Sequence, residues 1–134
     1  MSAAWGLAVS PLLGTDVLAE TRLAAVPLLS DTAMRPGNEL LAFVVGGASH
    51  LGVSIAWGIV FAYACGRRSP IATLAAGASF GVGVWLVMHR VLLPAMGVAW
   101  IVAGFSTARA ITEHVVFGLG VALGLLMRRR PRFC

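Results

Sequence analysis

The chain has few charged residues and no lysine. Only 11% of its 134 residues are charged, 59% are hydrophobic, and all ten basic residues are arginine. Soluble domains carry about 25% charged residues, so this composition would leave a water-facing surface with too few charges. The shortage of charge excludes an ordinary soluble domain and predicts a protein surrounded by lipid.

Other absences narrow the class further. The two cysteines, Cys65 and Cys134, match no metal-binding spacing and lie at arginine-marked ends, where we expect free thiols in a reducing cytoplasm. The N-terminus has no basic region and no small-residue cleavage site after a clean apolar stretch, so we expect no cleaved signal peptide. The sequence has no nucleotide-binding loop and no recognisable nucleophile and base pair, so we expect no enzymatic activity.

Long apolar segments are the main feature that is present. A helix needs about 20 residues to cross a hydrocarbon core about 30 Å thick. We therefore predict an all-α fold, a polytopic transmembrane bundle of about four helices that forms a single domain over residues 1–134. The predicted helices cover residues 3–29, 40–65, 70–94 and 110–127, and residues 96–105 form an interfacial connector.

The first of these helices has two interpretations. Asp16, Glu20 and Arg22 interrupt its apolar run, and one charge near the centre of a span costs a few kcal/mol. A full span over residues 3–29 would turn these charges toward the bundle interior and place both termini in the cytoplasm. The alternative is two half-length pieces on the membrane surface. We expect the span.

The helix boundaries carry recognisable signals. Asn38 is the predicted N-cap of the second helix, where Glu39 suits the positive end of the helix dipole, and Gly66 is its predicted C-cap. Ser69 and Pro70 then form a capping residue followed by proline at the first helical position. The short loop between Gly66 and Ser69 predicts antiparallel neighbours.

Arginine distribution predicts the orientation. One group of arginines lies in the turn between the second and third predicted helices, and another follows the last helix. Two spans separate these groups, so both lie on the same side of the membrane. Arginine is enriched on the cytoplasmic side, so we expect that side to be the cytoplasm. Nucleic-acid binding would need a basic face interleaved with polar and aromatic residues, so we expect no nucleic-acid partner. The two basic groups are Arg67 with Arg68, and Arg128, Arg129 and Arg130 with Arg132.

Small residues recur at a spacing of four. Such faces allow close approach of helices in lipid. We expect them to pack the bundle, and we expect the chain to associate with a second copy or a partner subunit through the Gly77/Gly81 and Gly120/Gly124 faces. The predicted helix-packing residues are Gly52, Gly58, Gly77, Gly81, Gly120 and Gly124.

Three histidines suggest a polar site in the outer half of the membrane. With a rise of 1.5 Å per residue, His50, His89 and His114 lie roughly 22, 27 and 20 Å from the cytoplasmic helix ends. His50 and His114 are thus nearly level. The candidate polar or metal cluster consists of His50, His89, His114, Glu113, Asp16, Glu20 and Arg90.

Several roles fit these side chains. Imidazole and carboxylate groups can bind a divalent metal or relay protons, and His50 and His114 could ligate a haem from both faces. The simpler interpretation is structural pairing near helix ends, with Glu113 placed favourably against the helix dipole and Arg90 reaching outward to water.

From His50 onward the sequence contains a series of short pieces whose order and spacing are distinctive. They are His50, Trp57-Gly58, Gly81, Trp85-Leu86-Val87-Met88-His89, Leu93-Pro94-Ala95-Met96-Gly97 and Glu113-His114-Val115-Val116-Phe117-Gly118. This part of the chain, about two thirds of the sequence, resembles the YagU-like family of small bacterial inner-membrane proteins, and the N-terminal third departs from the pattern. The resemblance implies a helical inner-membrane protein with no established reaction, and it favours His89, Glu113 and His114 as site residues.

Taken together, these patterns favour a non-enzymatic structural or accessory component of a membrane assembly in the bacterial inner membrane. The first alternative is metal or proton transport, or proton relay, through the cluster of histidines and carboxylates. The second is binding of haem or another pigment by His50 and His114.

Overall fold

The computed structural model describes residues 17–103 and 106–129, which form helices joined by short turns. Three helices are long and apolar enough to cross a membrane. Each begins and ends within one turn of its predicted bounds. They are α3 (Glu39–Cys65), the continuous run of α4 (Pro70–Val87), η3 (Met88–Leu92) and α5 (Leu93–Ala95), and α7 (Thr107–Arg129).

The turn between α3 and α4 forms as the sequence predicts. Gly66 ends α3 with φ 56°, a left-handed conformation that glycine adopts at little cost. Ser69 Oγ accepts a hydrogen bond from the Ala72 N–H at 3.3 Å, and Pro70 occupies the first turn of α4. The buried Thr73 hydroxyl also donates to the Ser69 carbonyl at 3.0 Å. Both the side chain and the backbone of Ser69 are therefore bonded to the first turn of α4.

The start of α3 differs from the prediction. Asn38 precedes the helix, but its side chain caps no backbone N–H of α3. Its Nδ2 instead donates to the Thr32 carbonyl at 3.2 Å, and Thr32 belongs to the short 3-10 helix η2 (Ser30–Met34). An amide can donate as well as accept, and here Asn38 uses its donor to tie η2 to the beginning of α3.

The second spanning run contains one widened turn. Proline lacks an N–H, and in a regular α-helix the ring of Pro94 would clash with the carbonyl of Arg90. The chain forms the π-helical turn η3 immediately before it, where the Leu93 N–H donates to the Met88 carbonyl. This turn carries His89 and Arg90 and keeps the helix continuous to Ala95.

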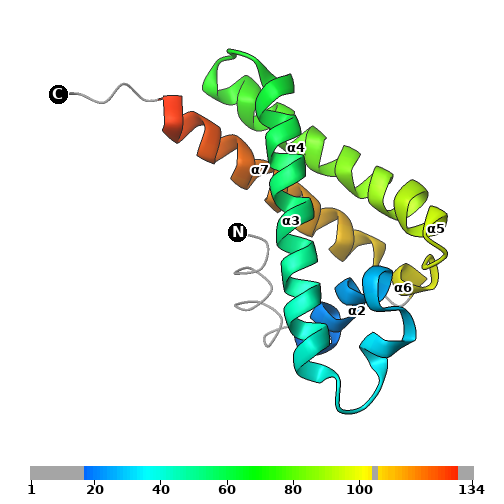
Figure 1. Ribbon diagram of the computed structural model, residues 1–134. Helices are drawn as coiled ribbons and strands as arrows, with labels where there is room; N and C mark the ends of the chain where they lie inside the picture. The colour runs from blue at the N-terminus through cyan, green and yellow to red at the C-terminus, as the bar shows by residue number, and fades with distance from the viewer. Residues whose placement is uncertain (1–16, 104–105, 130–134) are drawn as a thin grey trace.

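Helices α4 and α7 are antiparallel and pack with their backbones in contact. A Cβ at Gly81 would overlap the His114 carbonyl, and one at Gly118 would overlap the Gly77 carbonyl. Glycine at these positions allows an approach that no other residue permits. Figure 1 shows α4 and α7 running alongside each other, with α3 passing across them.

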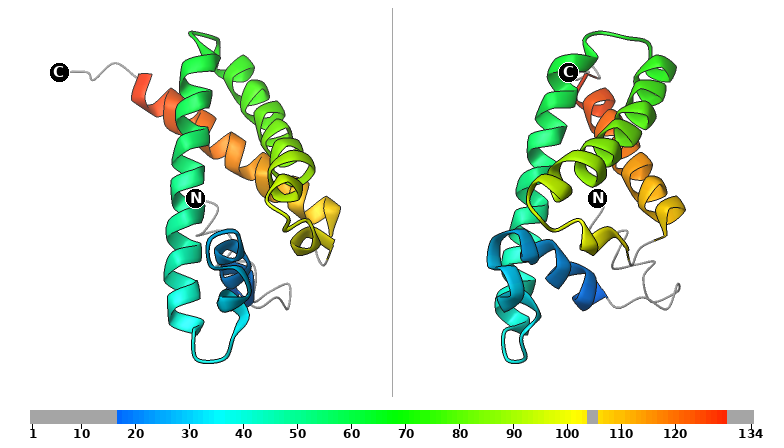
Figure 2. Two further views of the ribbon diagram at one scale, coloured as in Figure 1. Left: turned by 45° about the vertical axis from the view of Figure 1, so that its right-hand side comes forward. Right: turned by 90° about the vertical axis from the view of Figure 1, so that its right-hand side faces the viewer.

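Helix α3 meets this pair only near its C-terminal end. Phe61 and Cys65 are buried there together with Ala122 of α7. The rings of Phe61 and Trp57 also contact Phe80 of α4, with centroids 5.1 Å and 6.0 Å apart. Toward its Glu39 end, α3 diverges from α4 and α7 (Figure 2).

The described part of the first predicted span lies across α3. Helix α2 (Val17–Leu29) has 13 residues, which extend about 20 Å, less than a hydrocarbon core. It crosses α3 near the Glu39 end rather than running alongside it (Figure 2), with the Thr21 carbonyl against Gly46. Residues 3–16 of the predicted span lie outside the described part of the chain.

The connector after α5 packs onto this same end. The short helix α6 (Trp100–Ala103) places Ile101 against α2, η2 and α3, and leaves the Trp100 side chain exposed. Arg22 Nε donates to the Ala33 carbonyl at 3.1 Å and reinforces the junction of α2 and η2. The buried members of this cluster are Ala25, Val26, Ala33, Ala42 and Ile101.

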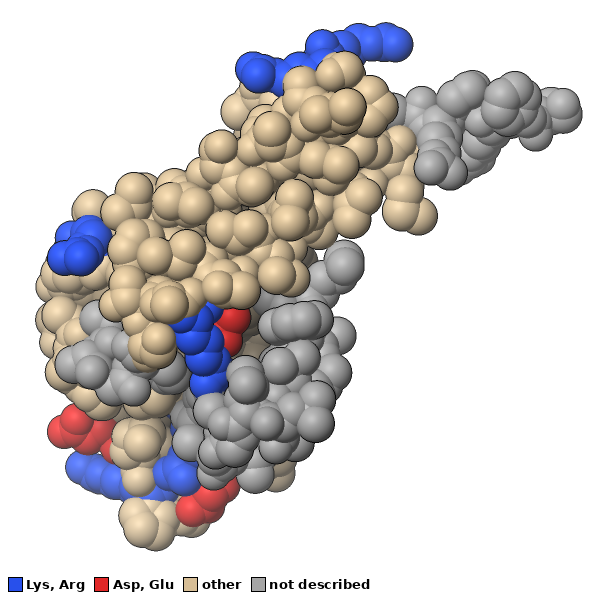
Figure 3. Space-filling view, turned by 180° about the vertical axis from the view of Figure 1, so that it is seen from behind, with Lys and Arg blue, Asp and Glu red and all other residues tan. Residues whose placement is uncertain are grey.

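Charge is distributed as a membrane protein requires. Figure 3 shows arginines at one end of the molecule and mixed charges toward the other, with a broad uncharged region between them. Large apolar side chains in that region, such as Leu51, Ile55 and Leu86, are exposed. Hydrocarbon is the medium in which such a surface is stable.

Candidate functional site

The structure brings together two of the three histidines. The rings of His89 in η3 and His114 in α7 meet edge to face, with centroids 5.4 Å apart. Side chains tilt toward the N-terminus of their helix. Because α4 and α7 are antiparallel and Gly81 rests on the backbone of His114, the two rings lean toward each other.

The orientation of the His114 ring follows from its hydrogen bond. Its Nδ1 lies 2.8 Å from the Ala110 carbonyl, one turn earlier on α7. A carbonyl oxygen only accepts, so Nδ1 is the donor of this bond. The His114 ring is therefore held in place by its own helix.

Trp85 extends the site on α4. Its ring centroid is 5.8 Å from that of His89, and the guanidinium carbon of Arg90 lies 6.0 Å from the same indole. Trp85 is only 9% exposed. Within the described part of the chain, Trp85 Nε1 and His89 Nδ1 are buried and have no hydrogen-bond partner. These two atoms are the unused hydrogen-bonding capacity of the site.

The carboxylate predicted for this cluster is engaged on its own helix. Arg109 Nε donates to Glu113 Oε1 at 2.8 Å, a pair four residues apart on α7. The predicted placement of Glu113 against the helix dipole is wrong, because α7 begins at Thr107 and Glu113 lies beyond its first turn. The structure therefore supports the structural interpretation of Glu113, with Arg109 as its partner.

Of the remaining predicted members, the structure describes the side chain of His50 but not those of Asp16 and Glu20. His50 has an exposed side chain on α3 and lies within electrostatic range of His114 and Glu113. Asp16 and the side chain of Glu20 are outside the described residues. Among residues 17–103 and 106–129, no three histidine, cysteine, aspartate or glutamate side chains gather as a metal ion would require. What the described residues form is a histidine pair beside Trp85.

Some of the predicted helix-packing glycines contact another helix and others do not. Gly77 and Gly81 contact α7, so this face is already covered within the chain. A Cβ at Gly52, Gly58 or Gly124 would meet no atom within 4 Å. The small residues of α7 that meet α4 are Gly118 and Ala122, a pair also four residues apart. The sequence prediction considered only the Gly120 and Gly124 pair on this helix and missed Gly118 with Ala122.

Comparison with known proteins yields no match: no family model, no curated protein and no solved structure matches the chain. The resemblance to the YagU-like family therefore stays a prediction, as does the emphasis it places on His89, Glu113 and His114. Composition and geometry alone carry the functional argument.

Proposed function

We propose that the chain is a non-enzymatic component of a membrane assembly, in which α3 binds a second copy or another membrane protein. The observation that carries this proposal is that the middle of α3 is not covered by the rest of the described chain. The buried residues of α3 are Ala42 and Gly46 near its start and Phe61 and Cys65 near its end. None of residues 47–60 is buried.

The middle of α3 has the composition of a helix interface. Ala48, Gly52 and Ala56 are exposed and, at a spacing of four, follow one side of α3. Lipid tails are as apolar as leucine, so burial of apolar area alone does not drive helix association, whereas small residues let two backbones approach and gain packing. The bulkier residues that flank this shallow strip are Leu51, Ile55 and Ile59, each more than half exposed.

The location belongs to the same proposal. We place the chain in the bacterial inner membrane, with the Arg67-Arg68 turn and the end of α7 in the cytoplasm, because arginine is enriched on that side. Helix α2 and the Glu39 end of α3 then lie at the outer surface, where the pairing of Arg109 with Glu113 is also tolerated. This arrangement corresponds to the surface interpretation of residues 17–29. A fourth span and a cytoplasmic N-terminus stay predictions.

Disulfide cross-linking in native membranes tests the proposed interface. In a chain with Cys65→Ala and Cys134→Ala, we expect Gly52→Cys to give an oxidised dimer or a larger adduct, because two cysteines bridge only when their Cα atoms come within about 7 Å. Leu86→Cys is the matched control, since Leu86 is 46% exposed on α4 and lies outside the small-residue strip. Equal adduct at both positions, or none at Gly52 together with a monodisperse monomer on native electrophoresis, would overturn the proposal.

A second candidate function, proton relay, is favoured by the contact of His89 with His114. Adjacent imidazoles can pass a proton, and such groups within membranes often serve that purpose. In proteoliposomes containing a trapped pH dye, a relay predicts a proton flux that His114→Asn abolishes and Thr112→Ser, on an exposed position of the same helix, preserves. Identical flux in the two variants would remove this candidate.

A further inference from the structure

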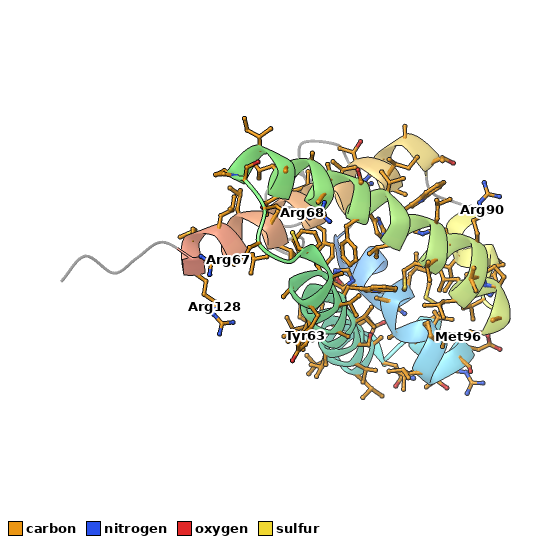
Figure 4. The ribbon with its side chains drawn as sticks, turned by 90° about the horizontal axis from the view of Figure 1, so that it is seen from above. Tyr63, Arg67, Arg68, Arg90, Met96 and Arg128 are labelled. Atoms are coloured by element: carbon orange, nitrogen blue, oxygen red, sulfur yellow. The ribbon has the colours of Figure 1, made fainter. Side chains whose placement is uncertain are left out.

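Three arginines from two separate elements lie together at one end of the molecule. Arg67 and Arg68 occupy the turn after α3, Arg128 lies in the last turn of α7, and all three are exposed. Viewed from above, Arg67 and Arg128 lie beside the end of α7, Arg68 lies nearer to α4, and all three lie apart from Arg90 (Figure 4). We refer to Arg67, Arg68 and Arg128 as the arginine end.

Packing of α3 against α7 positions the arginine end. Ala122 is buried with Phe61 and Cys65, and Leu125 packs against the same cluster. Arg128 follows Leu125 by three residues and so shares its side of α7. The Arg67-Arg68 turn begins directly after Cys65 and Gly66. The tertiary contact therefore brings together charges that are far apart in the sequence.

Arg68 is oriented by the end of α3. Its Nε donates to the Cys65 carbonyl at 2.9 Å, and the last carbonyls of a helix carry partial negative charge. This bond uses one donor of the guanidinium and leaves the N–H groups of its terminal nitrogens available. Arg68 is thus held in place while it can still bind an acceptor.

The described part of the chain offers these arginines no carboxylate. Asp31 and Glu39 lie at the opposite end of α3, and Glu113 is bound to Arg109 near the start of α7. No acidic residue occurs between Glu39 and Glu113 or after Glu113. Among the described residues, the arginine end therefore has no carboxylate counter-ion.

The position and chemistry of this end indicate which counter-ion. The arginine end marks where two spanning helices leave the hydrocarbon, at the level of lipid headgroups. Tyr63 is 86% exposed at the same end, as expected for an aromatic residue at the interface. The planar guanidinium fork binds phosphate oxygens in pairs, which a lysine ammonium does not. Every basic residue in this chain is arginine.

We propose that the arginine end binds the phosphate group of an anionic phospholipid and that the lipid bridges the α3–α4 turn to the end of α7. Basic residues at the membrane surface attract anionic lipids with about 1 kcal/mol per residue, which is roughly fivefold in affinity. A headgroup with two phosphates can engage both elements at once and binds more tightly than one with a single phosphate. This proposal does not depend on association through α3.

Lipid retention by the purified full-length chain tests the proposal. In mild detergent, native mass spectrometry should show phosphatidylglycerol retained in preference to phosphatidylcholine, and a lipid with two phosphates retained more strongly still. The triple variant Arg67→Gln, Arg68→Gln, Arg128→Gln should lose this preference, with roughly fivefold weaker retention for each arginine removed. Arg35→Gln, an exposed arginine at the opposite end, is the matched control and should retain the preference.

Further measurements separate the possible causes. Helical content and thermal unfolding in phosphatidylcholine establish that a variant is folded, and the single variant Arg128→Gln serves if the triple variant is not. Arg67→Lys and Arg128→Lys retain the charge but lose paired phosphate contacts, so their preference should weaken without disappearing. Equal retention of both lipids by the wild-type chain, an unchanged preference in the folded variants, or full displacement by millimolar inorganic phosphate would overturn a lipid site.

Discussion

The glycines at positions 77, 81 and 118 determine how closely α4 approaches α7. Each places its Cα where a Cβ would overlap backbone of the other helix. Backbone cannot move aside as a flexible side chain can, so substitution at these positions forces the helices apart. The contact of His89 with His114, which lies beside Gly81, depends on the same approach.

At this scale we predict that Gly118→Ala destabilises the protein. The added methyl group overlaps the Gly77 carbonyl, and overpacking costs about 1–3 kcal/mol. Thermal unfolding in detergent measures the effect. Gly83→Ala on α4 is the matched control: its Cβ meets nothing within 4 Å, so the higher helix propensity of alanine should leave stability equal or slightly higher. Equal melting temperatures for the two variants would contradict the backbone contact.

At the scale of elements, local chemistry decides where helices begin and how they continue. Ser69 caps α4 and the left-handed Gly66 ends α3, so the turn between them needs only a few residues. Pro94 does not break its helix. The widened π turn before it leaves room for the proline ring and changes the hydrogen-bond pattern where the proline N–H is missing. That turn also sets the direction from which His89 meets α7.

The cap of α4 gives a prediction at the element scale. Ser69→Ala removes the acceptor of the Ala72 N–H and should lower the free energy of unfolding by about 1 kcal/mol. Ser69→Asp keeps an acceptor and adds a favourable charge at the helix start, so it should match the wild-type chain. Unfolding in mixed detergent micelles measures both. An equal decrease in the free energy of unfolding in both variants would show that the Ser69 hydroxyl does not stabilise the protein by capping the Ala72 N–H.

At the scale of the whole molecule, the arrangement of three spanning helices places the arginine end opposite α2 and η2. Arginines lie at one end, and on the face that Figure 3 shows a broad uncharged region separates them from the mixed charges of the rest of the molecule. Among the described residues, arginines without a carboxylate partner lie at one end, whereas Arg22, Asp31 and Glu39 lie toward the other. This asymmetry is the basis of the proposed orientation in the membrane.

Cysteine labelling tests that orientation. In a chain with Cys65→Ala and Cys134→Ala, an impermeant maleimide added to intact cells should label Asp31→Cys, because Asp31 is exposed at the end that the proposed orientation places outside. Arg67→Cys should react only after the cells are opened, because the proposed orientation places the arginine end in the cytoplasm. Labelling of both positions from the same side would contradict the three-span arrangement.

Sequence alone determined the membrane class, the approximate bounds of α3, α4 and α7, and the common end of Arg67 and Arg128. Apolar length, capping residues and the number of intervening spans are local properties, and local properties can be read along the chain. Sequence also predicted correctly that Ser69 caps its helix. It was wrong about Asn38, because the Thr32 carbonyl that accepts from this side chain lies in η2, outside the helix being capped.

Only the tertiary structure decided which side chains meet. Counting residues gives the height of a side chain in the membrane, but it gives neither the rotation nor the tilt of its helix. The matched heights of His50 and His114 therefore did not identify His89 as the ring that contacts His114. The same reason explains why α7 presents Gly118 rather than Gly124 to α4. The crossing of α2 over α3 likewise follows from packing of Gly46 and Ser49 against α2, which the hydropathy of a single segment does not contain.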